Sequence, residues 1–213
     1  TKRDAYPMPD AHDSISRMSG HKYFARLDLW KGFHQIPVRE ADREFLAFRN
    51  RQELWQFTRM PFGVKNGSAA FQRAMHDAFR SLGKADHASV LKYISIFLDD
   101  IGIHAPDAET YIATLRAVFE LCRARKFRLK KSKCAFNLKV MEYVGFIADS
   151  NGYTLTDARR QGLADMPEPR TVKMLRSVLG VANFFRPFVP QFSKLTAPLT
   201  GMLRKGVKFV WSP

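Results

Sequence analysis

The chain has 213 residues, of which 46% are hydrophobic, and it carries a formal net charge of +15 at pH 7. This length and composition support a large buried core, in one domain or two packed subdomains, and exclude a disordered chain. No apolar run reaches about eighteen residues, and the basic, proline-containing start does not resemble a secretory signal. We therefore expect an intracellular protein without a membrane span.

The excess of positive charge predicts a surface that binds a polyanion. It is concentrated between Cys122 and Val140, where no acid occurs. By itself this stretch fits a solvated helix face followed by a basic strand as well as it fits phosphate contacts. The two cysteines, Cys122 and Cys134, have no metal-ligand spacing, so we interpret both as reduced packing residues.

In chain order, residues 10–18 predict a short helix that stops before Gly20. Residues 23–29, YFARLDL, form a short apolar strand with Asp28 near its end. After this strand, Gly32 would allow the backbone to lie close to a ligand. A hairpin is expected next, with residues 45–48 and 55–58 as strands and residues 50–53 as the turn.

Residues 60–68, MPFGVKNGS, form a glycine-rich turn that leads into a helix. The apolar face of this helix would contain Phe71, Met75, Phe79 and Leu82. This turn is typical either of a segment that contacts a nucleotide or of an ordinary turn fixed by one hydrophobic side chain.

Residues 94–105, ISIFLDDIGIHA, place two carboxylates, Asp99 and Asp100, inside an apolar run. Apolar segments on both sides predict a β-hairpin with both acids at its turn. Carboxylates in such surroundings require a counter-charge, and magnesium suits oxygen ligands on a rigid turn. A surface Asp-Asp turn is the alternative for this pair alone. With Asp28, however, three acids on two strands favour a two-metal site for phosphoryl transfer.

After Asp107, an expected N-cap, a helix should run to about residue 125 with Ile112, Leu115, Phe119 and Cys122 on one face. Beyond Gly152 the pattern predicts helices at residues 156–166, 171–185 and 193–204. Residues 207–211 resemble the start of a strand. On the second of these helices we expect Leu175, Leu179, Ala182 and Phe185 to be buried. Lys173 and Arg176 should be exposed.

Five blocks in this order resemble the reverse transcriptase of gypsy-type LTR retrotransposons: LDLWKGFHQIPVRE; LAFRN with WQFTRMPFGVKNGSAAFQRAM; FLDDIGIHA; LKKSKCAFNLKVMEYVGFI; and TVKMLRSVLGVANFFRPFVPQFSKLTAPLT. They cover nearly the whole chain. The sequence departs from the family at Phe97, where a tyrosine is usual.

The resemblance implies an α+β fold, a right-hand polymerase palm with an antiparallel sheet backed by helices. Residues 1–150 would be this palm with partial fingers, and residues 151–213 a helical thumb and the start of a connection segment. The implied activity is that of an RNA-directed DNA polymerase, which extends a primer with deoxynucleotides on RNA or DNA. The alternative is a catalytically silent, retroelement-derived protein that keeps the fold and binds nucleic acid or a partner.

The resemblance also implies site roles. Two Mg²⁺ ions, or Mn²⁺, would be held by Asp28, Asp99 and Asp100, the catalytic residues, with the Leu29 carbonyl. The nucleotide would contact Lys31, Gly32, Phe33, Phe62 and Gly63, with the Phe33 ring excluding a 2′-hydroxyl. Template and primer would contact Phe97, Lys130, Lys131, Lys133, Tyr143, Val144, Gly145, Lys173 and Arg176.

One lysine among Lys130, Lys131 and Lys133 would donate a proton to pyrophosphate, and the choice among them stays open. Expected partners are RNA and DNA template-primers, deoxynucleoside triphosphates, and ribonuclease H and integrase segments of the same polyprotein. The expected location is cytoplasmic, in a retroelement particle, or nuclear.

Overall fold

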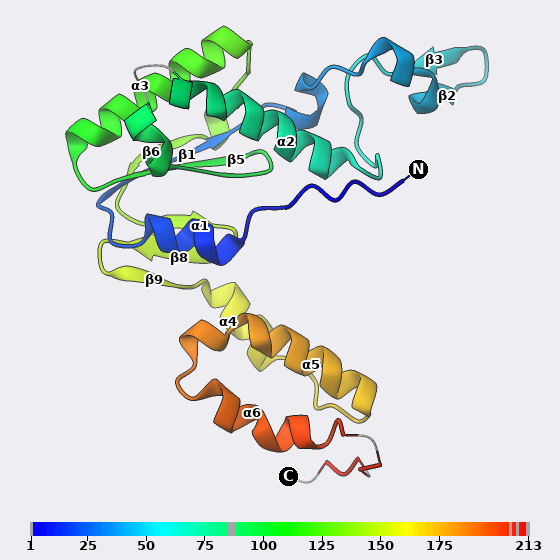
Figure 1. The fold of residues 1–213 in the computed structure, drawn as a ribbon, viewed down its shortest axis with the longest axis vertical. Helices are drawn as coiled ribbons and strands as arrows, with labels where there is room; N and C mark the ends of the chain where they lie inside the picture. Colours follow the sequence, from blue (N-terminus) through cyan, green and yellow to red (C-terminus); the bar gives the residue numbers. More distant parts are fainter. Residues whose placement is uncertain (1, 85–87, 205, 208, 212–213) are drawn as a thin grey trace. The chain divides into compact units, whose positions relative to one another are not determined.

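The computed structural model describes residues 2–84, 88–204, 206–207 and 209–211 (Figure 1). The chain divides into two compact units, Thr1–Tyr153 and Thr154–Pro213. Their interpretation as palm with partial fingers and as thumb stays a prediction. The sequence also predicts a polar connection at residues 81–89, of which residues 85–87 lie outside the described residues.

A four-stranded antiparallel sheet is the centre of unit 1, with the strand order β4-β5-β1-β6. Its strands are β1 (Tyr23–Asp28), β4 (Ile94–Phe97), β5 (Asp100–Ala105) and β6 (Ala135–Leu138). The expected strands that carry the aspartates, β1 and β5, are therefore direct neighbours. Their pairing confirms the predicted α+β architecture.

Two helices, α2 (Gly67–Arg80) and α3 (Ala108–Arg125), pack on one face of this sheet (Figure 1). Phe71, Met75 and Phe79 of α2 are buried, as the helical spacing predicts. Helix α3 begins where expected, because the Asp107 carboxylate accepts a hydrogen bond from the Thr110 amide at 2.8 Å.

The buried face of α3 agrees with the prediction only in part. Cys122 is buried and Leu115 packs against the core, as expected, but Ile112 and Phe119 are 56% and 41% exposed. The core side of α3 is lined by small or branched residues such as Ala117 and Val118, which allow the helix to lie close to the sheet. The spacing of apolar residues in the sequence therefore predicted a face of α3 that is rotated partly toward solvent.

The other face of the sheet is covered by α1 (Ala11–Met18) and the hairpin of β7 (Met141–Tyr143) and β8 (Phe146–Asp149), which a third strand, β9 (Gly152–Leu155), extends. Figure 1 shows α1 beside β8 on this side. Helix α1 matches the expected short helix and starts at the N-cap Asp10. Ile15, Met18 and Phe146 are fully buried here.

A separate hairpin of β2 (Ala47–Arg49) and β3 (Leu54–Gln56) confirms the expected hairpin, with shorter strands. Residues 57 and 58, which were expected to continue the second strand, lie outside it. The Asn50 side chain closes the turn by accepting hydrogen bonds from the amides of Gln52 and Glu53. Short 3₁₀ helices connect the remaining elements of unit 1: η1 (Gly32–Gln35), η2 (Glu40–Asp42), η3 (Glu44–Leu46), η4 (Ser81–Lys84), η5 (Ala88–Tyr93) and η6 (Lys131–Lys133).

Unit 2 contains α4 (Asp157–Ala164), α5 (Val172–Phe184), the 3₁₀ helix η7 (Arg186–Phe188) and α6 (Phe192–Gly201). These helices agree with the expected ones to within a few residues. On α5 and just beyond it, Leu175 and Phe185 are buried, while Lys173 and Arg176 are exposed, as predicted. Leu179 and Ala182, which were also expected to be buried, are only half-buried. The strand expected at residues 207–211 is wrong, because the described residues of this stretch form none.

Both cysteines are free thiols, Cys122 buried and Cys134 partly so, in agreement with packing roles. Burial raises the pKa of the Cys122 thiol to about 11, which makes it inert near neutral pH. No helix among the described residues is long and apolar enough to cross a membrane.

Candidate active site

The antiparallel register of β1 and β5 brings the predicted catalytic aspartates together. Asp28 and Asp100 are directly paired across these strands, and directly opposed residues point to the same face of a sheet. The two residues that turn β4 into β5 are Leu98 and Asp99, because Phe97 pairs with Asp100. Asp100 is thus the first residue of β5 and not part of the turn, which corrects the expected position. We call Asp28, Asp99 and Asp100 the carboxylate cluster.

The electrostatics of this cluster indicate an excess of negative charge. Burial raises the pKa of the Asp100 carboxyl above its usual range, and the charges of Asp99 and Asp28 add to the increase. Arg26 and Lys133 oppose it only in part. A cation bound at this place would remove the repulsion that these carboxylates experience.

Lys133 is the lysine that the fold places in the cluster. Its Nζ lies 3.2 Å from Oδ2 of Asp28. The backbone explains this approach, because the Lys130 amide donates to the Asp28 carbonyl at 2.8 Å and the short helix η6 follows directly. Among the three lysines that the sequence left open, Lys133 is therefore the one in contact with a carboxylate of the cluster.

Gly32 lies between the cluster and helix α2. A Cβ at this position would be 3.1 Å from Cζ of Phe71 and 3.3 Å from Cβ of Asp99, which is tighter than ordinary contacts. The residue before it, Lys31, has a left-handed backbone with φ of 49°. The chain therefore bends sharply beside Asp99, where the sequence predicted close approach to a nucleotide.

Three aromatic rings form the neighbourhood of this bend. The Phe33 ring stacks on Phe71 with centroids 4.9 Å apart, and it lies 5.2 Å from the Phe62 ring. Phe62 is 67% exposed, and the following Gly63 has φ of +82°. The structure thus brings the Phe33 and Phe62 rings into contact, with Phe33 directly after Gly32, which borders Asp99. Their contact with a nucleotide stays a prediction.

Sequence reasoning missed Gln72, which anchors the catalytic hairpin. Its side chain is fully buried on α2. The Gln72 Oε1 atom accepts a hydrogen bond from the Leu98 amide at 2.7 Å, and its Nε2 donates to the Ile96 carbonyl at 3.2 Å. A glutamine on the apolar face of α2 was the available signal, since buried polar groups require partners.

Val144 and Gly145, two of the expected template and primer contacts, form the turn between β7 and β8. Val144 and Gly145 both have positive φ, 49° and 78°, as a tight two-residue hairpin turn requires. Tyr143 is 2% exposed and its hydroxyl donates to the Asp100 carbonyl at 3.2 Å. This burial contradicts a direct contact of the Tyr143 side chain with nucleic acid. Its role is to connect the turn to β5.

The remaining predicted contacts are distributed as follows. Phe97 is half-buried at the end of β4, and Leu29 is buried and bridges to Leu129. Lys173 and Arg176 belong to unit 2 and are exposed on α5.

The donor atoms of the cluster suit a hard divalent cation, since they are carboxylate oxygens in a region of excess negative charge. Yet no group of three or more His, Cys, Asp and Glu side chains in the described part of the chain is arranged to hold a metal ion. The backbone thus brings the three acids to one place without closing them into a chelate. Metal binding stays a prediction that the residue types fit.

An antiparallel sheet backed by two helices, with acids at the ends of neighbouring strands, is the α+β architecture expected of a nucleotide-polymerising protein. A comparison with protein families matches residues 2–148 to "Reverse transcriptase (RNA-dependent DNA polymerase)". The chain belongs to this family.

Similar proteins support this assignment. The chain is 32% identical over 201 residues to the Retrovirus-related Pol polyprotein from transposon opus of Drosophila melanogaster, and 30% identical over 201 residues to that from transposon gypsy of the same organism. Each match covers 94% of this chain and 19% of the relative, so the chain spans about a fifth of their length. A solved foamy viral protease-reverse transcriptase in complex with an RNA/DNA hybrid has a TM-score of 0.71 at 25% identity, over 99% of this chain and 28% of that one.

Proposed function

We propose that this chain is the catalytic part of an RNA-directed DNA polymerase that extends a primer with deoxynucleotides on an RNA or DNA template. The observation that carries the proposal is the pairing of Asp28 with Asp100 and the position of Asp99 in the adjoining turn. Family membership supports the reaction type. The solved foamy viral relative in complex with an RNA/DNA hybrid supports the substrate class.

Each part of the site has a role in this reaction. Divalent ions held by the carboxylate cluster and the Leu29 carbonyl would stabilise the charges on the attacking and leaving oxygens of the α-phosphate. The rings of Phe33 and Phe62 would position the sugar and base. Lys133, which contacts Asp28, is the best placed of the three lysines to donate a proton to pyrophosphate.

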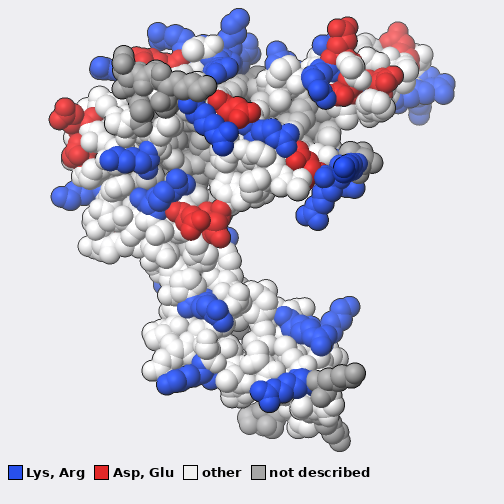
Figure 2. All heavy atoms as spheres, viewed as in Figure 1, with Lys and Arg blue, Asp and Glu red and all other residues white. Residues whose placement is uncertain are grey.

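The basic surface would hold template and primer by phosphate contacts. Figure 2 shows Lys and Arg spread over the visible face, with fewer acids. Lys130, Lys131, Val144 and Gly145 are the proposed contacts in unit 1, and Lys173 and Arg176 in unit 2. Because the relatives are Pol polyproteins, we propose ribonuclease H and integrase segments as partners, and a cytoplasmic particle or the nucleus as the location.

The test is primer extension with Mg²⁺ on an RNA template, with Asp99→Asn as the variant. We expect incorporation to fall by about 10³-fold or more, while the affinity for template-primer changes less than about threefold, because only charge at the reacting centre is lost. Asp13→Asn, which removes an exposed acid from α1, is the matched control and should extend primers normally.

Equal extension by Asp99→Asn and the parent would overturn the catalytic role of the cluster. The rival function, a silent nucleic-acid-binding protein, predicts instead that the parent binds template-primer and extends nothing under any divalent ion.

A further inference from the structure

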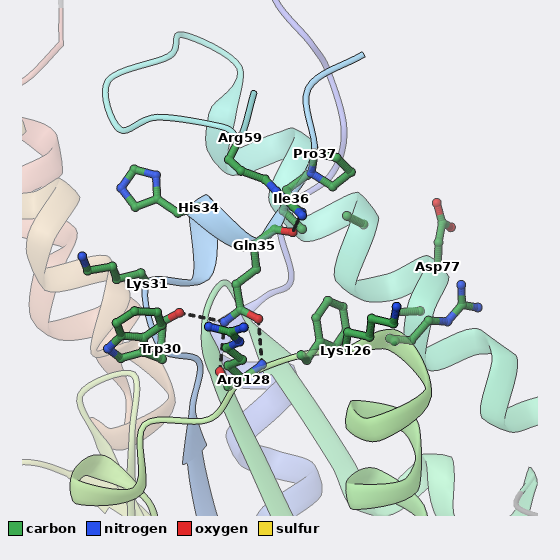
Figure 3. A pocket seen from close by; sticks show the side chains of 14 residues that line it. Trp30, Lys31, His34, Gln35, Ile36, Pro37, Arg59, Asp77, Lys126 and Arg128 are labelled. Atoms are coloured by element: carbon green, nitrogen blue, oxygen red, sulfur yellow. Dashed lines mark hydrogen bonds between the residues drawn. The ribbon is translucent and has the colours of Figure 1, made fainter. Parts of the chain in front are cut away.

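A pocket of about 860 Å³ lies beside the carboxylate cluster without including any of its three acids. Its walls are formed by residues 30, 31 and 34–37, by Arg59, by Ala74, Asp77 and Ala78 of α2, by Arg125 at the end of α3, and by the segment 126–128 that follows α3. We call it the Gln35 pocket, after the residue at its centre in Figure 3. Its volume is typical of sites for small molecules.

Hydrogen bonds of Gln35 hold the walls together. Its Nε2 donates to the carbonyls of Trp30 and Arg128 at 2.7 and 2.9 Å, and its Oε1 accepts from the Arg128 amide at 2.7 Å. Arg59 donates to the Gln35 carbonyl at 2.9 Å. The dashed lines in Figure 3 show these contacts. The pocket therefore joins segments 93 residues apart in sequence and is formed before any ligand binds.

The lining is strongly basic. Its cations are Lys31, Arg59, Arg125, Lys126 and Arg128, against a single acid, Asp77. In the part of the chain that the structure describes, none of these five forms an ion pair with a carboxylate, and Asp77 lies 3.7 Å from Arg80. Guanidinium groups that line one pocket without a carboxylate partner favour phosphate, which they bind through paired charge-assisted hydrogen bonds.

An aromatic ring completes the pocket. Trp30 is 43% exposed, and Nζ of Lys31 lies 5.1 Å from its ring centroid. An exposed indole beside a cluster of cations offers a stacking surface for a nucleobase.

We propose that the Gln35 pocket binds a polyphosphate of nucleotide size, with its phosphates on the arginines and, in a nucleoside triphosphate, its base against Trp30. A pocket of this volume, with five cations on walls that the Gln35 hydrogen bonds fix, has the size needed for a small polyanion. The proposal does not depend on polymerase activity, because it concerns binding outside the carboxylate cluster.

The test is isothermal titration of the full chain with inorganic tripolyphosphate and with ATP. A chelator present throughout prevents binding that requires divalent ions at the carboxylate cluster. We expect both probes to bind, and Arg125→Gln/Arg128→Gln to weaken both by about tenfold or more, since each arginine contributes charge-assisted contacts. The matched control, Arg116→Gln/Arg123→Gln, removes two arginines of α3 outside the pocket and should change both affinities less than about twofold.

Trp30→Ala distinguishes a site for a nucleoside triphosphate from a site for inorganic polyphosphate. Weaker ATP binding with unchanged tripolyphosphate binding identifies a nucleotide site, and no change for either probe identifies an inorganic polyphosphate site. Arg125→Gln and Arg128→Gln are also measured singly, with thermal unfolding as a check that each variant is folded.

Three results would overturn the proposal. One is equal weakening by the pocket and control variants, which would show that the whole basic surface attracts phosphate. The second is no binding of either probe. The third is a single-stranded oligonucleotide that binds through the same arginines while tripolyphosphate does not.

Discussion

Phe33 is a half-buried ring held by two other rings, Phe71 and Phe62. Such a ring cannot move aside for a 2′-hydroxyl, and a clash or an unpaired buried hydroxyl costs about 1–3 kcal/mol. In Phe33→Ala we therefore expect the ratio of deoxynucleotide to ribonucleotide incorporation to fall by about tenfold to a hundredfold, chiefly because ribonucleotide use improves.

Single-nucleotide extension with each nucleotide type measures this ratio. Phe45→Ala removes a ring that is 78% exposed near the β2–β3 hairpin and should leave the ratio unchanged. An unchanged ratio in active Phe33→Ala would show that Phe33 is only a packing residue.

His104 is a buried histidine whose titration affects stability. Its Nδ1 lies 2.8 Å from Nδ1 of His21, and Ser95 and Tyr93 contact the same ring. Burial, with the nearby His21 and Arg17, lowers the pKa of His104 to about 3. In the unfolded chain this histidine would bind a proton near pH 6.5, whereas in the folded chain it stays neutral down to about pH 3. The contribution of neutral His104 to stability is therefore fully present above pH 6.5 and is lost as the pH falls toward about 3.

From this residue we expect the free energy of unfolding to decrease by roughly 3–5 kcal/mol between about pH 6.5 and 3. Urea unfolding at several pH values measures it. In His104→Gln the same decrease should be clearly smaller. A parallel pH dependence in both proteins would assign the effect to other groups.

At the scale of elements, the β7–β8 hairpin and β5 meet through one side chain. The Tyr143 hydroxyl bonds the Asp100 carbonyl, and a Cβ at Gly102 would lie only 3.2 Å from the Tyr143 ring. The hairpin therefore lies directly on the catalytic strand, which allows Tyr143 to set the distance between the Val144–Gly145 turn and the cluster.

Tyr143→Phe tests this connection. We expect a loss of about 0.5–1.5 kcal/mol in the free energy of unfolding, and a several-fold lower kcat for incorporation with nearly unchanged template-primer affinity. Tyr93→Phe removes a hydroxyl outside this contact and is the control. If Tyr143→Phe lowers stability but keeps the kcat of the parent, the residue is structural and does not position the turn.

At the scale of the whole molecule, the net charge of +15 should determine how the chain binds template-primer. Neutralised phosphates release condensed counter-ions, so log K should fall linearly with log salt. For about four contacts we expect a roughly hundredfold loss of affinity between about 50 and 200 mM salt.

Fluorescence anisotropy with a labelled template-primer measures this slope. Lys130→Gln and Lys131→Gln should each reduce its magnitude by about one. Affinity that hardly changes with salt would contradict a phosphate-binding surface.

The local elements were readable from the sequence because short-range physics determines them. The short helix that starts after Asp10, the Asp107 cap and the buried face of α2 depend on residues only a few positions apart. The family resemblance likewise rested on ordered local blocks. These features determined the α+β class and the three candidate carboxylates.

Only the tertiary structure decided which distant groups meet. The sequence left three lysines open, and the fold brings Lys133 into contact with Asp28, 105 residues away. The support of the catalytic hairpin by Gln72, the bond from Tyr143 to Asp100 and the Gln35 pocket are also long-range contacts. Their partners depend on strand register and packing, which no local pattern encodes, and the face of α3 was misjudged for the same reason.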